Sequence, residues 1–227
     1  MRAEFRADLE IVSGILVTMA EQVRAAMSRA TSALLTADQT DAEEVLHADV
    51  DIDLGYQSVE ERVYELLARQ APVAGDLRLL VTALHVAADL ERMGDLAGHV
   101  AKVCLRRLPG VAVPEELVPV IKDMAAVSDG MAEKIADSLR SSDATLAAEL
   151  ERDDDRVDEL NRQLFALMLG TAWRHGVAES IDGAMLSRWY ERFADHAVNA
   201  GRQVVYLVTG EVPPRPTAPT APTAPIG

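Results

Sequence analysis

Aromatic residues, cysteine and long apolar runs are all scarce in this sequence, and each scarcity excludes a class of protein. Only 4% of the 227 residues are aromatic, although 49% are hydrophobic. Strands favour aromatic and β-branched residues, whereas alanine, leucine, glutamate, arginine and methionine favour helices. The composition therefore predicts an all-α fold in which helices pack on helices.

The only cysteine is Cys104, so the chain can form neither an intramolecular disulfide nor a zinc site built from several thiolates. A single thiol is typical of a reducing compartment. The longest nearly uncharged run, residues 77–88, is too short to cross a bilayer, and the N-terminus, with Glu4 and Asp8, lacks the layout of a signal peptide. We therefore expect a cytoplasmic protein that is not inserted directly into a membrane.

Positive charge is also in deficit. The chain carries 37 acidic residues against 22 lysines and arginines, which gives a formal net charge of −15 at pH 7. An acidic surface repels the phosphate backbones of nucleic acids. Nucleic acid is therefore not an expected partner, whereas basic protein faces and cations are.

The motifs of common catalytic and cofactor sites are missing as well. The sequence contains no glycine-rich nucleotide loop, no Gly-x-Ser-x-Gly, no His-Glu-x-x-His and no Cys-x-x-Cys. We therefore expect a protein that acts by binding and not as an enzyme.

Prolines divide the chain into regular segments. Pro72 opens one segment, Pro109, Pro114 and Pro119 cluster in the middle, and the next proline is Pro213. Between these points, apolar spacing predicts six long helices, over about residues 4–37, 40–70, 73–107, 114–140, 143–170 and 180–209. Residues 212–227, VPPRPTAPTAPTAPIG, form a Pro/Thr/Ala tail that we expect to be disordered.

The six predicted helices form two copies of one three-helix unit. In the third helix, spacings of four and three define an apolar seam: Leu79, Ala83, Val86, Leu90, Met93, Ala97, Val100 and Cys104. The sixth helix repeats the third at an offset of 100, as Val86 and Leu186 illustrate, and the first two helices recur at an offset of 105, as Ile52 and Val157 illustrate. The sequence thus predicts two pseudo-symmetric three-helix bundles, residues 1–110 and 111–211.

Acidic residues four positions apart recur at equivalent places in both predicted repeats. The pairs are Asp49 and Asp53, Glu91 and Asp95, Asp154 and Asp158, and Glu191 and Asp195. Residues at i and i+4 share one helix face, where like charges destabilise the helix by about a few tenths of a kcal/mol. Two such pairs on neighbouring helices favour a multivalent cation between them, because hard ions bind carboxylate oxygens. By helical angle, the pairs of the third and sixth helices point away from the apolar seam.

The alternative interpretation is that these acids are solvated helix faces. Arg92 and Arg192 follow the two glutamates directly and could balance their charge. Di-metal bundles that activate oxygen use Glu-x-x-His motifs, and no histidine lies three residues after Glu91 or Glu191.

Histidines give weaker indications. His99 lies one turn after Asp95 and has Asn199 as its counterpart, so either residue could supply a further ligand. We expect His85 to pack between helices and His196 to be a hydrogen-bonded residue of the core.

The residues also resemble a known family. The segment LLARQAPVAGDLRLLVTALHVAADLERMGDLAGHVAK, residues 66–102, closely resembles the diagnostic segment of the PhoU family. RDDDRVDELNRQ at 152–163 and YERFADHAVN at 190–199 are similar to the second repeat of that family. The resemblance covers residues 1 to about 210 and leaves out only the tail.

This resemblance implies a cytoplasmic negative regulator of the phosphate-starvation response and of phosphate uptake. Members are thought to link the ATPase subunit PstB of the phosphate ABC transporter to the histidine kinase PhoR, and often form homodimers. Their E(D)-x-x-x-D motifs, which fall here on the eight acidic residues, can bind iron, zinc, magnesium, calcium or other divalent or trivalent ions. His99 departs from the family, which usually has asparagine there, so the two sites need not bind the same metal.

Two other functions remain open from the sequence. A carboxylate-bridged metalloenzyme should lose turnover when its metal is removed, whereas an adaptor should lose binding or regulation. A metal-free helical scaffold should be unaffected by chelation.

Overall fold

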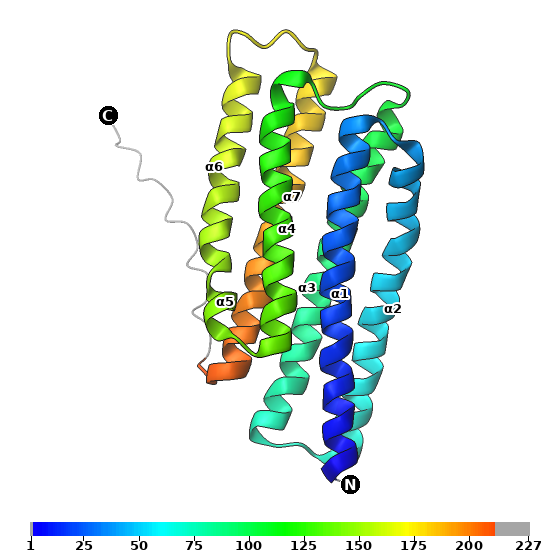
Figure 1. The fold of residues 1–227 in the computed structure, drawn as a ribbon, viewed down its shortest axis with the longest axis vertical. Coiled ribbons are helices and arrows are strands. Elements are labelled where there is room, and N and C mark those ends of the chain that lie inside the picture. Colours follow the sequence, from blue (N-terminus) through cyan, green and yellow to red (C-terminus); the bar gives the residue numbers. More distant parts are fainter. Residues whose placement is uncertain (1, 212–227) are drawn as a thin grey trace, which may run out of the picture.

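The computed structural model describes residues 2–211, which form helices joined by short connections (Figure 1). The helices are α1 (Arg2–Thr36), α2 (Gln39–Gln70), α3 (Ala74–Arg107), the 3-10 helix η1 (Glu115–Leu117), α4 (Val118–Ser141), α5 (Ala144–Ala148), α6 (Leu150–Leu169) and α7 (Val177–Thr209). The all-α prediction is confirmed over this range. The predicted tail, residues 212–227, lies outside the described residues.

The breaks between helices follow local chemistry. At the start of α2, the Asp38 side chain accepts a hydrogen bond from the backbone N–H of Asp41, at 3.0 Å. At the start of α5, Asp143 accepts from the backbone of Thr145 and Leu146. Such caps satisfy N–H groups that have no partner inside the helix. Pro119 lies in the first turn of α4, where its missing N–H does no harm.

One predicted helix is divided. The segment expected at 143–170 is interrupted at Glu149, whose N–H bonds to the carbonyls of Leu146 and Ala147, and α5 and α6 lie on either side. The interruption lies where the chain packs against Gly201 of α7. A β-carbon at Gly201 would lie only 2.8 Å from the carbonyl oxygen of Ala147. The bend lets α5 press closely on α7.

The helices are arranged so that each half of the chain lies beside the other along its length. In Figure 1, α1 and α4 run side by side in front, α3 and α7 lie behind them, and α2 and α6 form the two flanks. The contacts between α1 and α4, and between α3 and α7, join the two halves. No helix within residues 2–211 is long and apolar enough to span a membrane.

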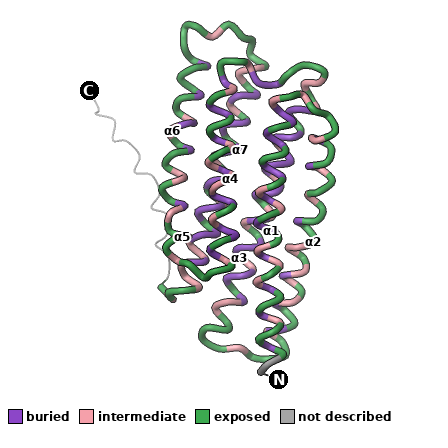
Figure 2. The backbone as a smooth tube through the Cα atoms, in the orientation of Figure 1, coloured by how far each residue is buried: buried purple, intermediate pink, exposed green. Residues whose placement is uncertain are grey.

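Helix α3 is central, and most of its residues between Leu80 and Cys104 are buried (Figure 2). It packs against α1, α2 and α7. Cys104 belongs to this core, as expected, and its thiol lies 3.2 Å from the carbonyl of Ala33. The expectation that His85 packs between helices is wrong, because His85 lies on the exposed stripe with Val81 and Ala88 that no neighbouring helix covers.

Polar contacts also connect the two halves. Arg24 of α1 donates two hydrogen bonds to the carboxylate of Asp129 on α4, at 2.9 and 2.8 Å. The buried hydroxyls of Thr31 and Tyr190 lie 2.6 Å apart. The Nδ1 atom of His196 lies 2.9 Å from Asp89 on α3, so the predicted hydrogen bond is present, but the residue is partly exposed and does not belong to the core.

At one end of the molecule a buried carboxylate holds two arginines. Arg106 and Arg107, in the last turn of α3, each donate to a different oxygen of Asp182 on α7. The Asp182 residue is 3% exposed. This ion pair fixes the end of α3 against the beginning of α7.

Candidate functional site

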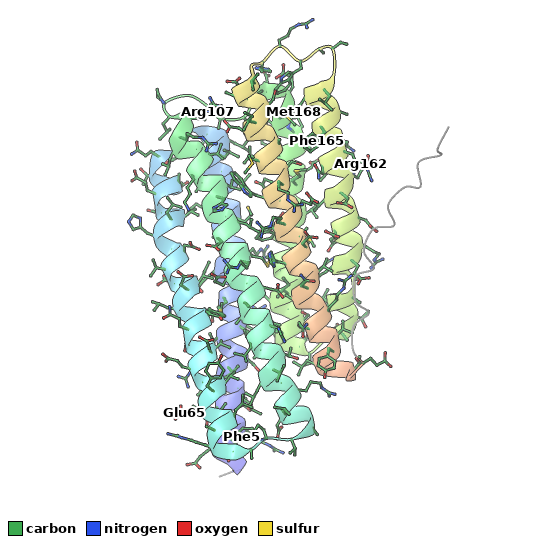
Figure 3. The ribbon with its side chains drawn as sticks, turned by 180° about the vertical axis from the view of Figure 1, so that it is seen from behind. Phe5, Glu65, Arg107, Arg162, Phe165 and Met168 are labelled. Carbon is green, nitrogen blue, oxygen red and sulfur yellow. The ribbon has the colours of Figure 1, made fainter. Side chains whose placement is uncertain are left out.

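The acidic pairs of the first repeat meet where α2 packs against α3. Figure 3 views this side of the molecule, with α3 and α7 side by side and α2 and α6 flanking them. We call Asp49, Asp53, Glu91 and Asp95 the first carboxylate face. Burial raises the pKa of Asp49, and the charges of Asp53 and Asp95 raise it further. Burial also raises the pKa of Glu91, against the opposing effect of Arg92, and the other three acids add to the rise.

Close approach of the two helices depends on Gly94. A β-carbon there would lie 2.9 Å from the Ile52 side chain and 3.1 Å from an oxygen of Asp49. Because glycine leaves this space free, α2 packs directly on α3 and the Asp49 carboxylate lies against the α3 backbone. The glycine therefore helps to bring the two acidic pairs together.

The acidic pairs of the second repeat meet in the same way on α6 and α7. We call Asp154, Asp158, Glu191 and Asp195 the second carboxylate face. Burial raises the pKa of Asp154 to about 6, and the charges of Asp195 and Asp158 contribute. The pKa of Asp195 is also raised, first by burial and then by Glu191. The charges of Asp154 on α6 and Asp195 on α7 thus act on one another across the contact between these two helices.

The two acids of α3 lie outside the core and differ in exposure. The Glu91 side chain is 22% exposed, although that of Asp95 is 42% exposed. Asp95 lies along the exposed stripe of α3 that includes Ala88 and Arg92. Glu91 is the more buried of the two, and burial raises its pKa.

Other polar side chains contact the acids. Arg92 lies 2.8 Å from Asp95 and 3.4 Å from Glu91. On the second face, Arg188 lies 3.1 Å from one oxygen of Glu191, and the Asn161 amide is 3.5 Å from the other. The sequence interpretation missed Asn161, although it lies three residues after Asp158 on the same helix face.

The side chains of both faces are of the type that hard cations bind. Among the residues that the structure describes, however, no group of three or more acidic, histidine or cysteine side chains is placed so that it could hold a metal ion. Each face draws its four carboxylates from two helices, and burial is the main cause of the raised pKa values of Asp49, Glu91, Asp154 and Asp195. Carboxylate oxygens suit hard divalent and trivalent ions.

The two candidate additional ligands have different surroundings. The His99 ring packs edge-on against Trp189 of α7, with ring centroids 5.4 Å apart. Asn199 is exposed. Their role as ligands stays a prediction.

Replacing Asp154 with asparagine is expected to stabilise the metal-free protein at pH 7.5 by about 1 kcal/mol, after allowance for solvent screening. The folded state holds the Asp154 proton more tightly than the unfolded chain, since the pKa rises to about 6 on folding. Ionisation of Asp154 therefore destabilises the folded state fully above about pH 6, and not at all below the unfolded pKa of about 4. The gain should disappear at pH 4. Denaturant unfolding at pH 4, 5.5 and 7.5 measures it.

Asp155 provides the control for this prediction, because it is the exposed neighbour of Asp154. Asp155→Asn should change stability less at every pH. A metal-free Asp154→Asn protein that is no more stable than wild type at pH 7.5 would contradict the burial argument.

Comparison with known proteins matches nearly the whole described chain. A model of the PhoU domain matches twice, at residues 16–104 and 121–204. The starts of these segments differ by 105 and their ends by 100, which are the two offsets of the predicted repeats. The twofold repeat in the sequence is therefore confirmed by an independent match.

Individual relatives and a solved structure indicate the same family. "Phosphate-specific transport system accessory protein PhoU homolog 2" of Mycobacterium tuberculosis is 42% identical over 213 residues, which cover 94% of this chain and 100% of that protein. PhoU homolog 1 of the same species is 41% identical, over 94% and 96% of the two chains. The crystal structure of PhoU from Pseudomonas aeruginosa has a TM-score of 0.81 and 28% identity, and covers 91% of this chain and 100% of that one.

Proposed function

We propose, from the premise that this chain belongs to the PhoU family, that it links phosphate transport to phosphate sensing by binding a protein of each system. Family membership makes it a regulatory accessory protein of phosphate transport and not an enzyme. The observation that carries the proposal is the match of both repeats to relatives named as accessory proteins of the phosphate-specific transport system.

The proposed partners are the transporter ATPase PstB and the histidine kinase PhoR, at the cytoplasmic side of the membrane. When phosphate is plentiful, the protein would restrain uptake and keep the kinase inactive. The net charge of −15 supports partners with basic surfaces. Homodimer formation is part of the proposal and rests on the family resemblance.

The proposed metal ligands are the residues of the two carboxylate faces. Asp49 and Asp53 of α2 would share an ion with Glu91 and Asp95 of α3, and the second face would do the same between α6 and α7. A bound cation supplies positive charge that neutralises the carboxylates and joins the two helices. The chain contributes the oxygen donors and the Gly94 contact that brings α2 onto α3.

Loss of this protein is expected to switch on the phosphate-starvation response in phosphate-rich medium, because an adaptor that silences the kinase would be missing. The measurement is alkaline phosphatase or another starvation reporter in null and complemented strains. In parallel, purified protein should capture the ATPase and the cytoplasmic kinase domain, and capture should weaken as salt rises.

The null strain needs one control, since this chain is almost equally similar to two different PhoU homologs. A strain that also lacks any second PhoU copy removes compensation. An unchanged reporter in that strain, together with no capture of either domain, would reject the signalling proposal.

Metal binding by the two faces is expected to be separable. Glu91→Ala with Asp95→Ala should remove metal from the first face only, and Glu191→Ala with Asp195→Ala from the second only. Metal content of protein purified without chelator or a nickel column measures this. Unchanged content in both double variants would show that these residues are not ligands.

A further inference from the structure

The outer side of α2 carries large apolar side chains that are exposed. Val50, Leu54 and Tyr64 each have more than half of their surface exposed. Helix α2 packs against α1 and α3 and forms one flank of the molecule (Figure 1). By helical position the three side chains share one face, opposite the buried Val59, and this face runs for about 20 Å along the helix. We call it the outer face of α2.

The fold does not require apolar residues at these positions. In the second repeat, at the offset of 105, the counterparts of Val50 and Leu54 are Asp155 and Glu159, and α6 is a regular helix that includes both. Two apolar side chains one turn apart, where the other repeat has charged ones, are therefore not explained by helix formation. Exposed apolar side chains that lie together are typical of a binding surface.

A groove lies beside the outer face. It has a volume of about 560 Å³ and runs between α1 and α2, and its lining includes the small side chains of Ala25, Ser28 and Ala48. Asp51, which follows Val50 in the chain, also lines it. Small side chains let another element approach closely. A groove between two helices, next to an apolar face of several turns, suits a helix laid along α2.

The charge of this part of α2 is entirely negative. Residues 39–61 include eight acidic residues and no lysine or arginine, whereas the corresponding residues 144–166 include three arginines. Arg29 of α1 contacts two of the α2 acids. Among the described residues, however, neither Asp51 nor Glu61 forms an ion pair. These carboxylates remain available to basic side chains of a partner.

We infer that the outer face of α2, with the groove beside it, binds an amphipathic helix of a partner protein whose apolar stripe is flanked by lysine or arginine. Val50, Leu54 and Tyr64 contact the apolar stripe, and Asp51 and Glu61 pair with the basic side chains. The inference rests on the proposed function, in which this chain binds proteins of the transport and sensing systems. It adds the surface and the chemistry of the segment that this surface recognises.

Charge disfavours the other occupants of such a face. A second copy of a chain with a net charge of −15 would be repelled by the acids of α2. Anionic lipid headgroups would be repelled in the same way. A helix with basic flanks is instead attracted, and complementary charge of this kind mainly raises the association rate and the specificity.

The test measures binding of the full chain to a synthetic helical peptide of about 18 residues, or five turns, with leucine along one face and lysine on the rest. Binding to the purified ATPase and to the cytoplasmic kinase domain is measured in parallel. Val50→Asn with Leu54→Gln removes apolar contacts without changing charge. This variant should weaken binding of the peptide, and of at least one domain, by about tenfold or more. Asp51→Asn with Glu61→Gln should slow association and reduce its dependence on salt.

The second repeat supplies the matched control. Asp155→Asn with Glu159→Gln changes the corresponding positions of α6, removes the same amount of charge, and should leave affinity and salt dependence unchanged. A peptide of the same composition with its leucines scattered around the helix should bind wild type and the Val50→Asn, Leu54→Gln variant equally. Helicity and Tm of each variant verify folding.

Equal binding of the peptide and of both domains by wild type and the Val50→Asn, Leu54→Gln variant would overturn the inference, and capture of the domains would then leave the proposed function standing. Conversion of a dimer into a monomer by the same variant, measured by sedimentation, would also overturn it, because the face would then belong to a second copy. Peptide binding that depends on Val50 and Leu54, with neither domain captured, would support the surface and reject only the partners named in the proposed function.

Discussion

Asp182→Ala is expected to lower the free energy of unfolding by about 3 kcal/mol. The substitution removes a carboxylate that is 3% exposed and leaves Arg106 and Arg107 without the oxygens to which they donate. Breaking a buried pair from one side typically costs about 3–5 kcal/mol. The lower end of this range applies here, because the Arg106 side chain is 57% exposed and can be solvated by water. In a chain of this size, Tm should fall by roughly 6–12 °C.

Two controls separate the buried pair from ordinary surface charge. Asp182→Asn keeps the shape and one acceptor oxygen, so it should cost less than the alanine variant. Glu65→Ala breaks the exposed pair with Arg69 in α2 and should change stability by under about 1 kcal/mol. If Asp182→Ala cost no more than Glu65→Ala, the ion pair would not fix α3 to α7.

Gly201→Ala is expected to destabilise the protein by about 2 kcal/mol, although alanine is the better helix former. A β-carbon at this position of α7 would overlap the Leu150 side chain and lie 2.8 Å from the backbone carbonyl of Ala147. A backbone group cannot rotate away as a side chain can. The α5–α6 junction would therefore have to move off α7, and denaturant unfolding would measure the loss.

Gly130 is the matched control, since it lies inside α4 with nothing within 4 Å of its would-be β-carbon. There the same substitution should stabilise by about 0.5–1 kcal/mol through helix propensity alone. Opposite signs at the two glycines are the expected outcome. Equal effects would mean that α5 does not depend on close contact with α7.

Most of the fold could be predicted because the information is local. Proline positions and side chains such as Asp38 and Asp143 mark helix ends, and four-three spacing identifies the seam of each helix. The break at Glu149 could not be predicted, because its cause is a contact with α7, more than fifty residues away. The burial of α3 on three sides was also hidden, since one helix's sequence does not reveal how many neighbours it will have.

The candidate site shows the same division. Spacing of four and recurrence in both repeats singled out the eight carboxylates, and the structure places them on two pairs of packed helices, α2 with α3 and α6 with α7. Asn161 was missed because it has neither a charge nor a repeated counterpart. Its relevance follows only from the contact between α6 and α7 that brings it to Glu191.

Arg24 and Asp129 occupy the same place in the two repeats, since their numbers differ by 105, and they contact each other between α1 and α4. A residue that meets its own counterpart lies on the axis relating the two halves. In an assembly of two identical single-repeat chains, that residue would face itself, and two arginines or two aspartates would repel each other. When both copies belong to one polypeptide, the amino acid at this position can change in one copy independently of the other. An attractive pair can then occupy a position where strict symmetry permits only like against like.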